Sequence, residues 1–184
     1  FSQAEATVMR LRAQNLDVVK QICDAGRHRI LTCLCADNWE AADAELGRIT
    51  QLAKGILNRS FFLALIKSCA DLGVYVALFW SVEAMERIAR CKPNLATFNA
   101  VIHACAKGLR LDLAEDGWER MTNAGVRPNT ITYNNMIHAY ALARQPSKAE
   151  WWFQQMELNS LKPCVVSFGS VIDGFAKMGN IRKA

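Results

Sequence analysis

The stretch that decides the fold is Pro93-Asn94-Leu95-Ala96-Thr97-Phe98-Asn99. It returns as Pro128-Asn129-Thr130-Ile131-Thr132-Tyr133-Asn134 and again as Pro163-Cys164-Val165-Val166-Ser167-Phe168-Gly169, with a step of 35 residues each time. A fixed period of about 20–50 residues is typical of proteins that stack one structural unit many times. We therefore expect a repeat architecture.

Each unit contains two stretches in which apolar residues recur at helical spacing. In the clearest unit, the first helix has an apolar face formed by Phe98, Val101, Ile102 and Cys105, and the second helix begins near Leu111. The period-2 alternation of strands is absent. Because a lone helix pair cannot bury its apolar faces, neighbouring pairs must stack on one another. The sequence thus predicts an all-α fold, a right-handed α-solenoid of 35-residue helix-turn-helix repeats.

The repeat is clear in one half of the chain and weak in the other. We expect well-formed repeats in residues 93–184, with the last one truncated, since Ala184 falls at the position of Ala114 and Ala149. We expect degenerate helical repeats of the same continuous solenoid in residues 1–92. The chain does not begin with methionine and stops inside a repeat, so we interpret it as an internal piece of a longer protein.

Two helix boundaries are predicted in the weaker half. The glycine of Asp24-Ala25-Gly26 is expected to break a first helix over residues 2–22. Asn38 is expected to cap a later helix that ends near Gly55. Residues 59–92 are expected to form a further helix pair.

The cysteines predict core positions rather than disulfides or a metal site. Cys33, Cys69 and Cys105 are each 36 residues apart, which places them at one equivalent position where a free thiol packs as a small apolar group. The Cys33-x-Cys35 pair has no second pair at zinc spacing. We expect no metal and no cofactor.

Composition and charge indicate a folded chain without a membrane span. The 184 residues are 52% hydrophobic, but no run reaches the roughly 18 apolar residues of a transmembrane helix. We therefore expect no direct membrane insertion. The net charge of +5 is spread over both halves, and it suits either a nucleic-acid partner or an ordinary solvated surface.

No pattern in the sequence suggests catalysis. A glycine-rich phosphate loop, a paired-carboxylate motif and a nucleophile elbow are all missing, so we expect neither an enzyme nor a small-molecule substrate. His103 and His138 share one repeat position and are expected to be structural or surface residues. Trp151-Trp152-Phe153 could stack on bases, but packing between repeats is the preferred interpretation.

The repeated strings resemble the pentatricopeptide repeat family. The resemblance is carried by Thr97-Phe98-Asn99-Ala100-Val101-Ile102, by its two later copies, and by Gly125-Val126-Arg127-Pro128-Asn129. The tetratricopeptide family has a period of about 34, but its Trp…Leu-Gly…Tyr pattern is absent. The resemblance implies a protein that binds single-stranded RNA, one base per repeat.

The resemblance also implies the residues that would touch RNA. In the family, the fifth and last residues of a repeat contact the base and the second packs against it. Counting from Leu95, the base-reading pair is Asn99 with Asn129, which favours a pyrimidine, and Ala96 packs beside them.

The other repeats carry the same positions with different residues. Asn134 pairs with Cys164 beside Ile131, and Val166 holds the packing position of the last repeat. Gly169 and Leu63 stand at reading positions without a group that can read a base. Lys107 and Lys177 occupy the place where the family often contacts phosphate.

Two functional hypotheses follow. The first is a soluble, organellar RNA-binding adaptor, in the chloroplast or the mitochondrion, that acts in RNA processing, stability or translation. The alternative is a structural or scaffold subunit of a large organellar complex, whose partners are protein subunits rather than RNA. The sequence leaves open which RNA would be bound and which organelle would hold the protein.

Overall fold

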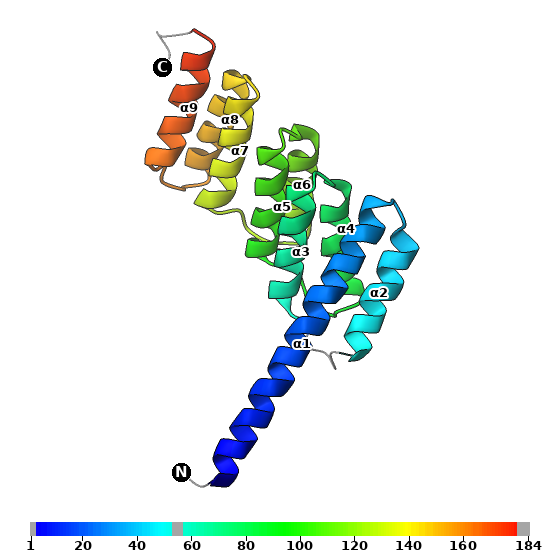
Figure 1. Ribbon diagram of the computed structural model, residues 1–184. Helices are drawn as coiled ribbons and strands as arrows, with labels where there is room; N and C mark the ends of the chain where they lie inside the picture. The colour runs from blue at the N-terminus through cyan, green and yellow to red at the C-terminus, as the bar shows by residue number, and fades with distance from the viewer. Residues whose placement is uncertain (1–2, 53–56, 180–184) are drawn as a thin grey trace.

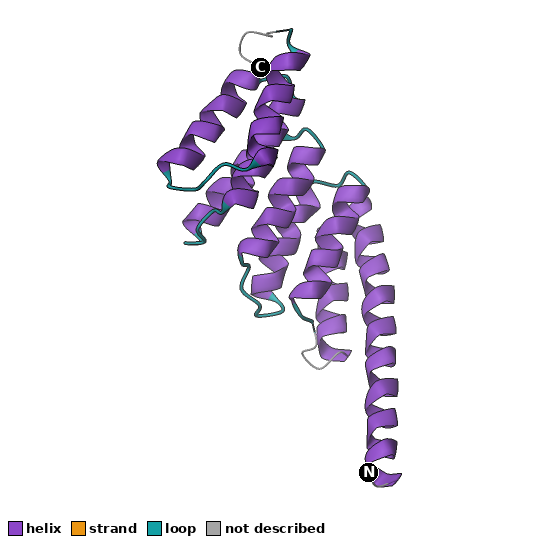
Figure 2. Ribbon diagram, turned by 90° about the vertical axis from the view of Figure 1, so that its left-hand side faces the viewer, coloured by secondary structure: helices purple, strands orange, loops and turns teal. Residues whose placement is uncertain are grey.

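The chain forms an all-α solenoid. The computed structural model describes residues 3–52 and 57–179, and within these ranges every regular element is a helix (Figure 2). The helices are α1 (Gln3–Cys35), α2 (Trp39–Leu52), α3 (Arg59–Asp71), α4 (Val76–Arg87), α5 (Leu95–Lys107), α6 (Leu111–Asn123), α7 (Thr130–Leu142), α8 (Pro146–Leu158) and α9 (Val165–Lys177). The predicted fold class, a solenoid of stacked helix pairs, is confirmed.

The helices lie in two layers (Figure 1). The odd-numbered helices α1, α3, α5, α7 and α9 contact one another in chain order and make one layer. The helices α2, α4, α6 and α8 each pack against the helix that precedes them. Helices α3, α5 and α7 therefore each have two neighbours in their own layer.

The core repeats with the sequence. Phe98 and Tyr133 are each 4% exposed, and Ile102 and Ile137 are fully buried one turn further along their helices. Cys69 and Cys105 are fully buried at the equivalent position, whereas Cys33 is half-buried against the core. All seven cysteines are free.

The aromatic cluster of α8 also packs as expected. The Trp152 ring lies edge-on to Trp118, with ring centroids 4.6 Å apart, and it also contacts Tyr133. Trp152 is 7% exposed, so it joins the core between two repeats, while Trp151 is half-exposed.

The predicted break at Asp24-Ala25-Gly26 is wrong. Helix α1 runs without interruption from Gln3 to Cys35, and its N-terminal part projects beyond the helix pairs (Figure 1). Gly26 is buried there against α2, and a Cβ atom at this position would lie 2.3 Å from Cδ1 of Ile49. This glycine allows two helices to approach closely, and it does not end one.

The boundaries of α2 were predicted in part. Asn38 caps this helix, because its Oδ1 accepts a hydrogen bond from the backbone N–H of Ala41 at 3.0 Å. The helix end expected near Gly55, and the position of Ala184, lie outside the described residues.

The last described helix keeps the apolar pattern but not the burial. Phe168 and Ile172 of α9 are 52% and 46% exposed, although Phe98 and Ile102 are buried at the equivalent positions. A groove of about 430 Å³ runs between α8 and α9 and is lined by both exposed side chains together with Phe153.

Candidate nucleic-acid interface

The interface begins with the caps of helices α5 and α7. The side chain of Asn129 accepts from the backbone N–H of Thr132 at 3.1 Å, and the Thr132 hydroxyl accepts from the backbone N–H of Asn129 at 3.1 Å. Asn94 and Thr97 make the same reciprocal arrangement at the start of α5. Such capping boxes satisfy backbone donors that a helix start leaves free, so each asparagine is held rigidly.

The structure brings the predicted pair Asn99 and Asn129 together across two helices. The Asn99 amide nitrogen Nδ2 donates to Oδ1 of Asn129 at 3.4 Å. The buried hydroxyl of Thr132 donates to Oδ1 of Asn99 at 2.7 Å. The Asn99 side chain is therefore held at both ends, because its Oδ1 accepts from Thr132 and its Nδ2 donates to Asn129. These two bonds fix the orientation of the amide. One N–H of Nδ2 is left over to donate elsewhere.

The same geometry recurs one repeat later with different atoms. Nδ2 of Asn134 donates to Sγ of Cys164 at 3.4 Å, and the Ser167 hydroxyl donates to Oδ1 of Asn134 at 2.6 Å. Hydrogen bonds from Ser167 and from the Asn134 amide lower the pKa of the exposed Cys164 thiol to about 7. At neutral pH this position therefore presents a thiol and a thiolate in comparable amounts.

This arrangement is absent at Leu63 and Gly169, the two reading positions predicted to have no group that reads a base. Leu63 of α3 offers no polar atom to Asn94 and Thr97, whose hydrogen bonds stay within their own capping box. Gly169 of α9 has no side chain at all. Among the described residues, the linked arrangement therefore occurs at two successive junctions of the solenoid.

The predicted packing residues stand on the same face of their helices. Ala96, Ile131 and Val166 are exposed, and Ile131 and Val166 keep 58% and 60% of their surface open. Ala96 and Ile131 each lie three residues before a reading asparagine, which is the spacing of neighbours on one helix face.

The two predicted phosphate contacts differ. Lys107 is exposed at the end of α5 and borders a hollow between α3 and α5. Nζ of Lys177 lies 2.5 Å from a carboxylate oxygen of Asp173 on the preceding turn, so its charge is already compensated. His103 and His138 are exposed on the same layer of helices, as predicted for surface residues.

Thr132 and Ser167 are site residues that the sequence reasoning missed. Both are fully buried and both orient a reading asparagine. The sequence does contain a pattern that could have revealed them, because a hydroxyl residue recurs two positions after the start of each of these helices. Spacing alone did not show that this hydroxyl reaches an amide on the preceding first helix.

Comparison with known proteins assigns the repeat to a family. A model of the PPR repeat family matches residues 93–141 and 128–177, and a model of the pentatricopeptide repeat domain matches residues 54–108. A sequence comparison with curated proteins found no match. The fold and the 35-residue repeat together define a helical-repeat protein, in which each repeat is a pair of antiparallel helices. The chain belongs to the pentatricopeptide repeat family.

Solved structures share the fold at low sequence identity. The pentatricopeptide repeat protein PPR10 from maize superposes with a TM-score of 0.65 at 16% identity, over 86% of this chain and 22% of that one. Its complex with an 18-nt psaJ RNA element gives a TM-score of 0.51 at 16% identity, over 96% and 25%. Nuclear proteinaceous RNase P 2 (PRORP2) from A. thaliana gives 0.56 at 18% identity, over 87% and 36%.

The chain thus spans between about a fifth and about a third of the length of these structures. Among its described residues, no helix is both long and apolar enough to cross a bilayer. The same residues contain no group of three or more histidine, cysteine, aspartate or glutamate side chains placed to hold a metal ion.

Proposed function

We propose that this chain binds single-stranded RNA on its layer of first helices and serves in an organelle as an adaptor in RNA processing, stability or translation. It acts by binding rather than by catalysis. The observation that carries the proposal is the linked arrangement of Asn99, Asn129 and Thr132, which recurs 35 residues later in Asn134, Cys164 and Ser167. The RNA-bound structure of PPR10, which has this fold, supports it.

The mechanism follows from how the amides are held. Thr132 anchors the oxygen of Asn99, so the free N–H of Nδ2 points away from that bond and meets an acceptor on a base edge. The Asn129 amide adds its own donors beside it. A pyrimidine presents suitable acceptors, and the exposed apolar surfaces of Ala96 and Ile131 contact the two faces of the ring.

A shift in binding affinity tests the proposal. The 184-residue chain is titrated into labelled single-stranded RNA oligonucleotides that differ in one base, and binding is followed by fluorescence anisotropy. Asn99→Ala is expected to lower the preference for a pyrimidine at one position, by up to about 1–3 kcal/mol. Gln154→Ala, which removes an exposed amide from α8, is the matched control.

Salt dependence provides the second measurement. Phosphate contacts release counterions, so affinity must fall as salt rises. Absence of binding, or binding that does not change with salt, would contradict an RNA-binding role. Imaging of a tagged full-length protein tests the organellar part separately.

Protein binding is the second candidate, and the groove between α8 and α9 favours it. Phe168 and Ile172, which lie one helical turn apart, leave about half of their surfaces exposed there, and contiguous exposed apolar surface of this kind is typical of interaction sites. This candidate predicts a stoichiometric protein partner whose association survives nuclease treatment. It also predicts that Phe168→Ser releases the partner.

A further inference from the structure

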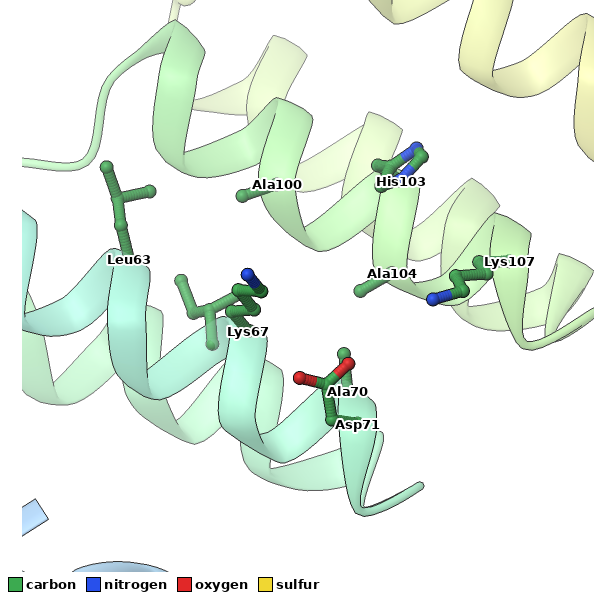
Figure 3. A pocket seen from close by; sticks show the side chains of 9 residues that line it. Leu63, Lys67, Ala70, Asp71, Ala100, His103, Ala104 and Lys107 are labelled. Carbon is green, nitrogen blue, oxygen red and sulfur yellow. The ribbon is translucent and has the colours of Figure 1, made fainter.

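Both layers of the solenoid contain a hollow. On the layer of first helices, the space between α3 and α5 stays open beside Leu63, because Ala100 has no atoms beyond Cβ (Figure 3). On the other layer, a slot of about 440 Å³ lies between α6 and α8, within the range of about 300–1,000 Å³ for ligand pockets. All residues that line this slot belong to α6 and α8, so it lies apart from the helices proposed to bind RNA.

Two indole rings and one carboxylate line the slot. The rings of Trp151 and Trp152 stand nearly at right angles, with an interplanar angle of 85° and ring centroids 5.0 Å apart. Trp152 is held in the core, whereas half of the Trp151 surface is exposed. Glu115 lines the slot from α6. The slot thus combines a flat aromatic surface with a negative charge.

The carboxylate of Glu115 is held through only one of its oxygens. The buried Tyr140 hydroxyl donates to Oε1 of Glu115. The same oxygen lies 3.5 Å from Nζ of Lys148, whereas a strong charged hydrogen bond measures about 2.7–2.9 Å. Within the described part of the chain, Oε2 of Glu115 has no partner. This second oxygen is therefore left to accept from a donor that enters the slot.

The two preceding junctions of the same layer show what such a carboxylate binds. Between α2 and α4, Nη2 of Arg87 donates to both oxygens of Asp43, at 2.7 and 2.8 Å. Between α4 and α6, Nη1 of Arg120 donates to Glu83 at 2.7 Å. The Arg120 guanidinium also lies over the Phe79 ring, 4.6 Å from its centroid. At both junctions an arginine satisfies a carboxylate of the preceding second helix.

The junction between α6 and α8 has the carboxylate and the aromatic surface, but no arginine lines it. Its base is Lys148, which carries a point charge on a flexible stem and reaches Glu115 only at long range. A guanidinium group is planar, stacks on aromatic faces and donates parallel hydrogen bonds to a carboxylate. The slot therefore suits an arginine better than the lysine that the chain supplies.

We propose that this slot binds an arginine side chain of a protein partner. The guanidinium stacks on the exposed indole of Trp151 and donates to Oε2 of Glu115, while Lys148 moves aside into solvent. A protein is favoured over a nucleic acid because the unengaged group is a carboxylate, which repels phosphate. The inference goes beyond RNA binding and does not depend on it. It gives the chain a second binding face on the layer that RNA does not use.

A pair of peptides of matched shape tests the slot. The 184-residue chain, isotope-labelled in its tryptophan indoles, is titrated with a capped peptide of sequence glycine-serine-arginine-serine-glycine, and the indole N–H signal of Trp151 is followed by NMR. A second peptide carries citrulline, which has the shape of arginine without its charge. The arginine peptide is expected to shift the signal saturably and to bind about fivefold or more tightly than the citrulline peptide. Equal affinities, or no shift at Trp151, overturn the proposal.

Two variants and a control locate the binding. Glu115→Gln is expected to abolish the preference for arginine over citrulline, because a neutral amide attracts no cation. Lys148→Met removes the competing charge and is expected to tighten binding of the arginine peptide about twofold or more; weaker binding by this variant would contradict the assigned geometry. Glu119→Gln changes an exposed carboxylate one turn further along α6 and is expected to leave the preference unchanged. The two peptides on the unaltered chain decide the matter even if a variant folds poorly.

RNA is the alternative occupant. If single-stranded RNA shifts the Trp151 signal and the arginine peptide does not, the slot is a stacking platform for bases and the proposal is overturned. Glu115→Gln is expected to leave the RNA affinity within about twofold of the unaltered chain. A chain that binds the arginine peptide but no RNA keeps the slot and loses the RNA-binding function, and a chain that binds only RNA at its first helices does the reverse.

Discussion

The hydroxyl of Thr132 links two repeats, and a matched pair of substitutions measures that link. Thr97 and Thr132 occupy the same position of consecutive helices, and both are fully buried. Each hydroxyl has one proton to donate: that of Thr97 goes to Oδ1 of Asn94, whereas that of Thr132 goes to Oδ1 of Asn99 at 2.7 Å. Valine has the shape of threonine without its hydroxyl, so replacing each threonine by valine isolates the polar contacts.

The magnitudes follow from these contacts. Thr97→Val loses the reciprocal half of a capping box, which costs about 1 kcal/mol. Thr132→Val loses the same contact and leaves Oδ1 of Asn99 without its donor, whereas after Thr97→Val the Oδ1 of Asn94 keeps the backbone N–H of residue 97. A typical intramolecular hydrogen bond adds about 0.5–1.5 kcal/mol, so Thr132→Val is expected to be about 1 kcal/mol more destabilising than Thr97→Val.

Urea denaturation followed by far-UV circular dichroism measures both variants. The double variant Thr132→Val with Asn99→Ala supplies a check, since removing both partners must cost less than the sum of the two single changes. If the two threonine variants agree within about 0.3 kcal/mol, the cross-repeat hydrogen bond contributes nothing, and the orientation that we assign to Asn99 has no energetic basis.

Three further predictions use contrasts within the chain. Gly26→Ala is expected to lower stability by about 1–3 kcal/mol, because the new Cβ would meet the buried side chain of Ile49. Gly47→Ala is expected to raise stability by about 0.5–1 kcal/mol, because no atom lies within 4 Å of the new Cβ. Thermal melts compare the two variants. Phe98→Ala is expected to cost about 3–5 kcal/mol and Phe168→Ala far less, since the first ring is 4% exposed and the second 52%; equal losses in urea would count against this. The Cys164 thiol is expected to react with iodoacetamide at a rate that rises with pH and is half-maximal near pH 7, because its pKa is lowered to about 7 and the thiolate is the reacting form. A midpoint near the ordinary pKa of 9.0 would exclude the hydrogen bonds assigned to this thiol.

Much of the fold could be predicted because its causes are local and repeated. The apolar spacing of Phe98 and Ile102 marks one helix face, and its return after 35 residues shows that the unit is stacked. Asn38 was recognised as a cap because a side chain only three residues from its partner needs no tertiary contact. Gly26 was misinterpreted because a glycine that breaks a helix and one that admits a neighbouring helix look alike in sequence.

The sequence predicted the repeat position of each apolar side chain better than it predicted whether that side chain is buried. Phe168 has the same place in its repeat as Phe98, yet it is half-exposed, because burial depends on what lies against a helix and not on the residues within it.

By itself, the sequence determined that the chain is a solenoid of stacked helix pairs, and it predicted most of the positions that enter the core. These properties follow from periodicity, which reports the side of a helix on which a residue lies. Only the tertiary structure decided that Thr132 fixes the amide of Asn99, that Ser167 does the same for Asn134, and that Ala100 leaves a hollow beside Leu63. Each of these contacts joins two helices, through residues more than 30 positions apart in the sequence. They therefore depend on how closely the helices pack, which no local pattern encodes.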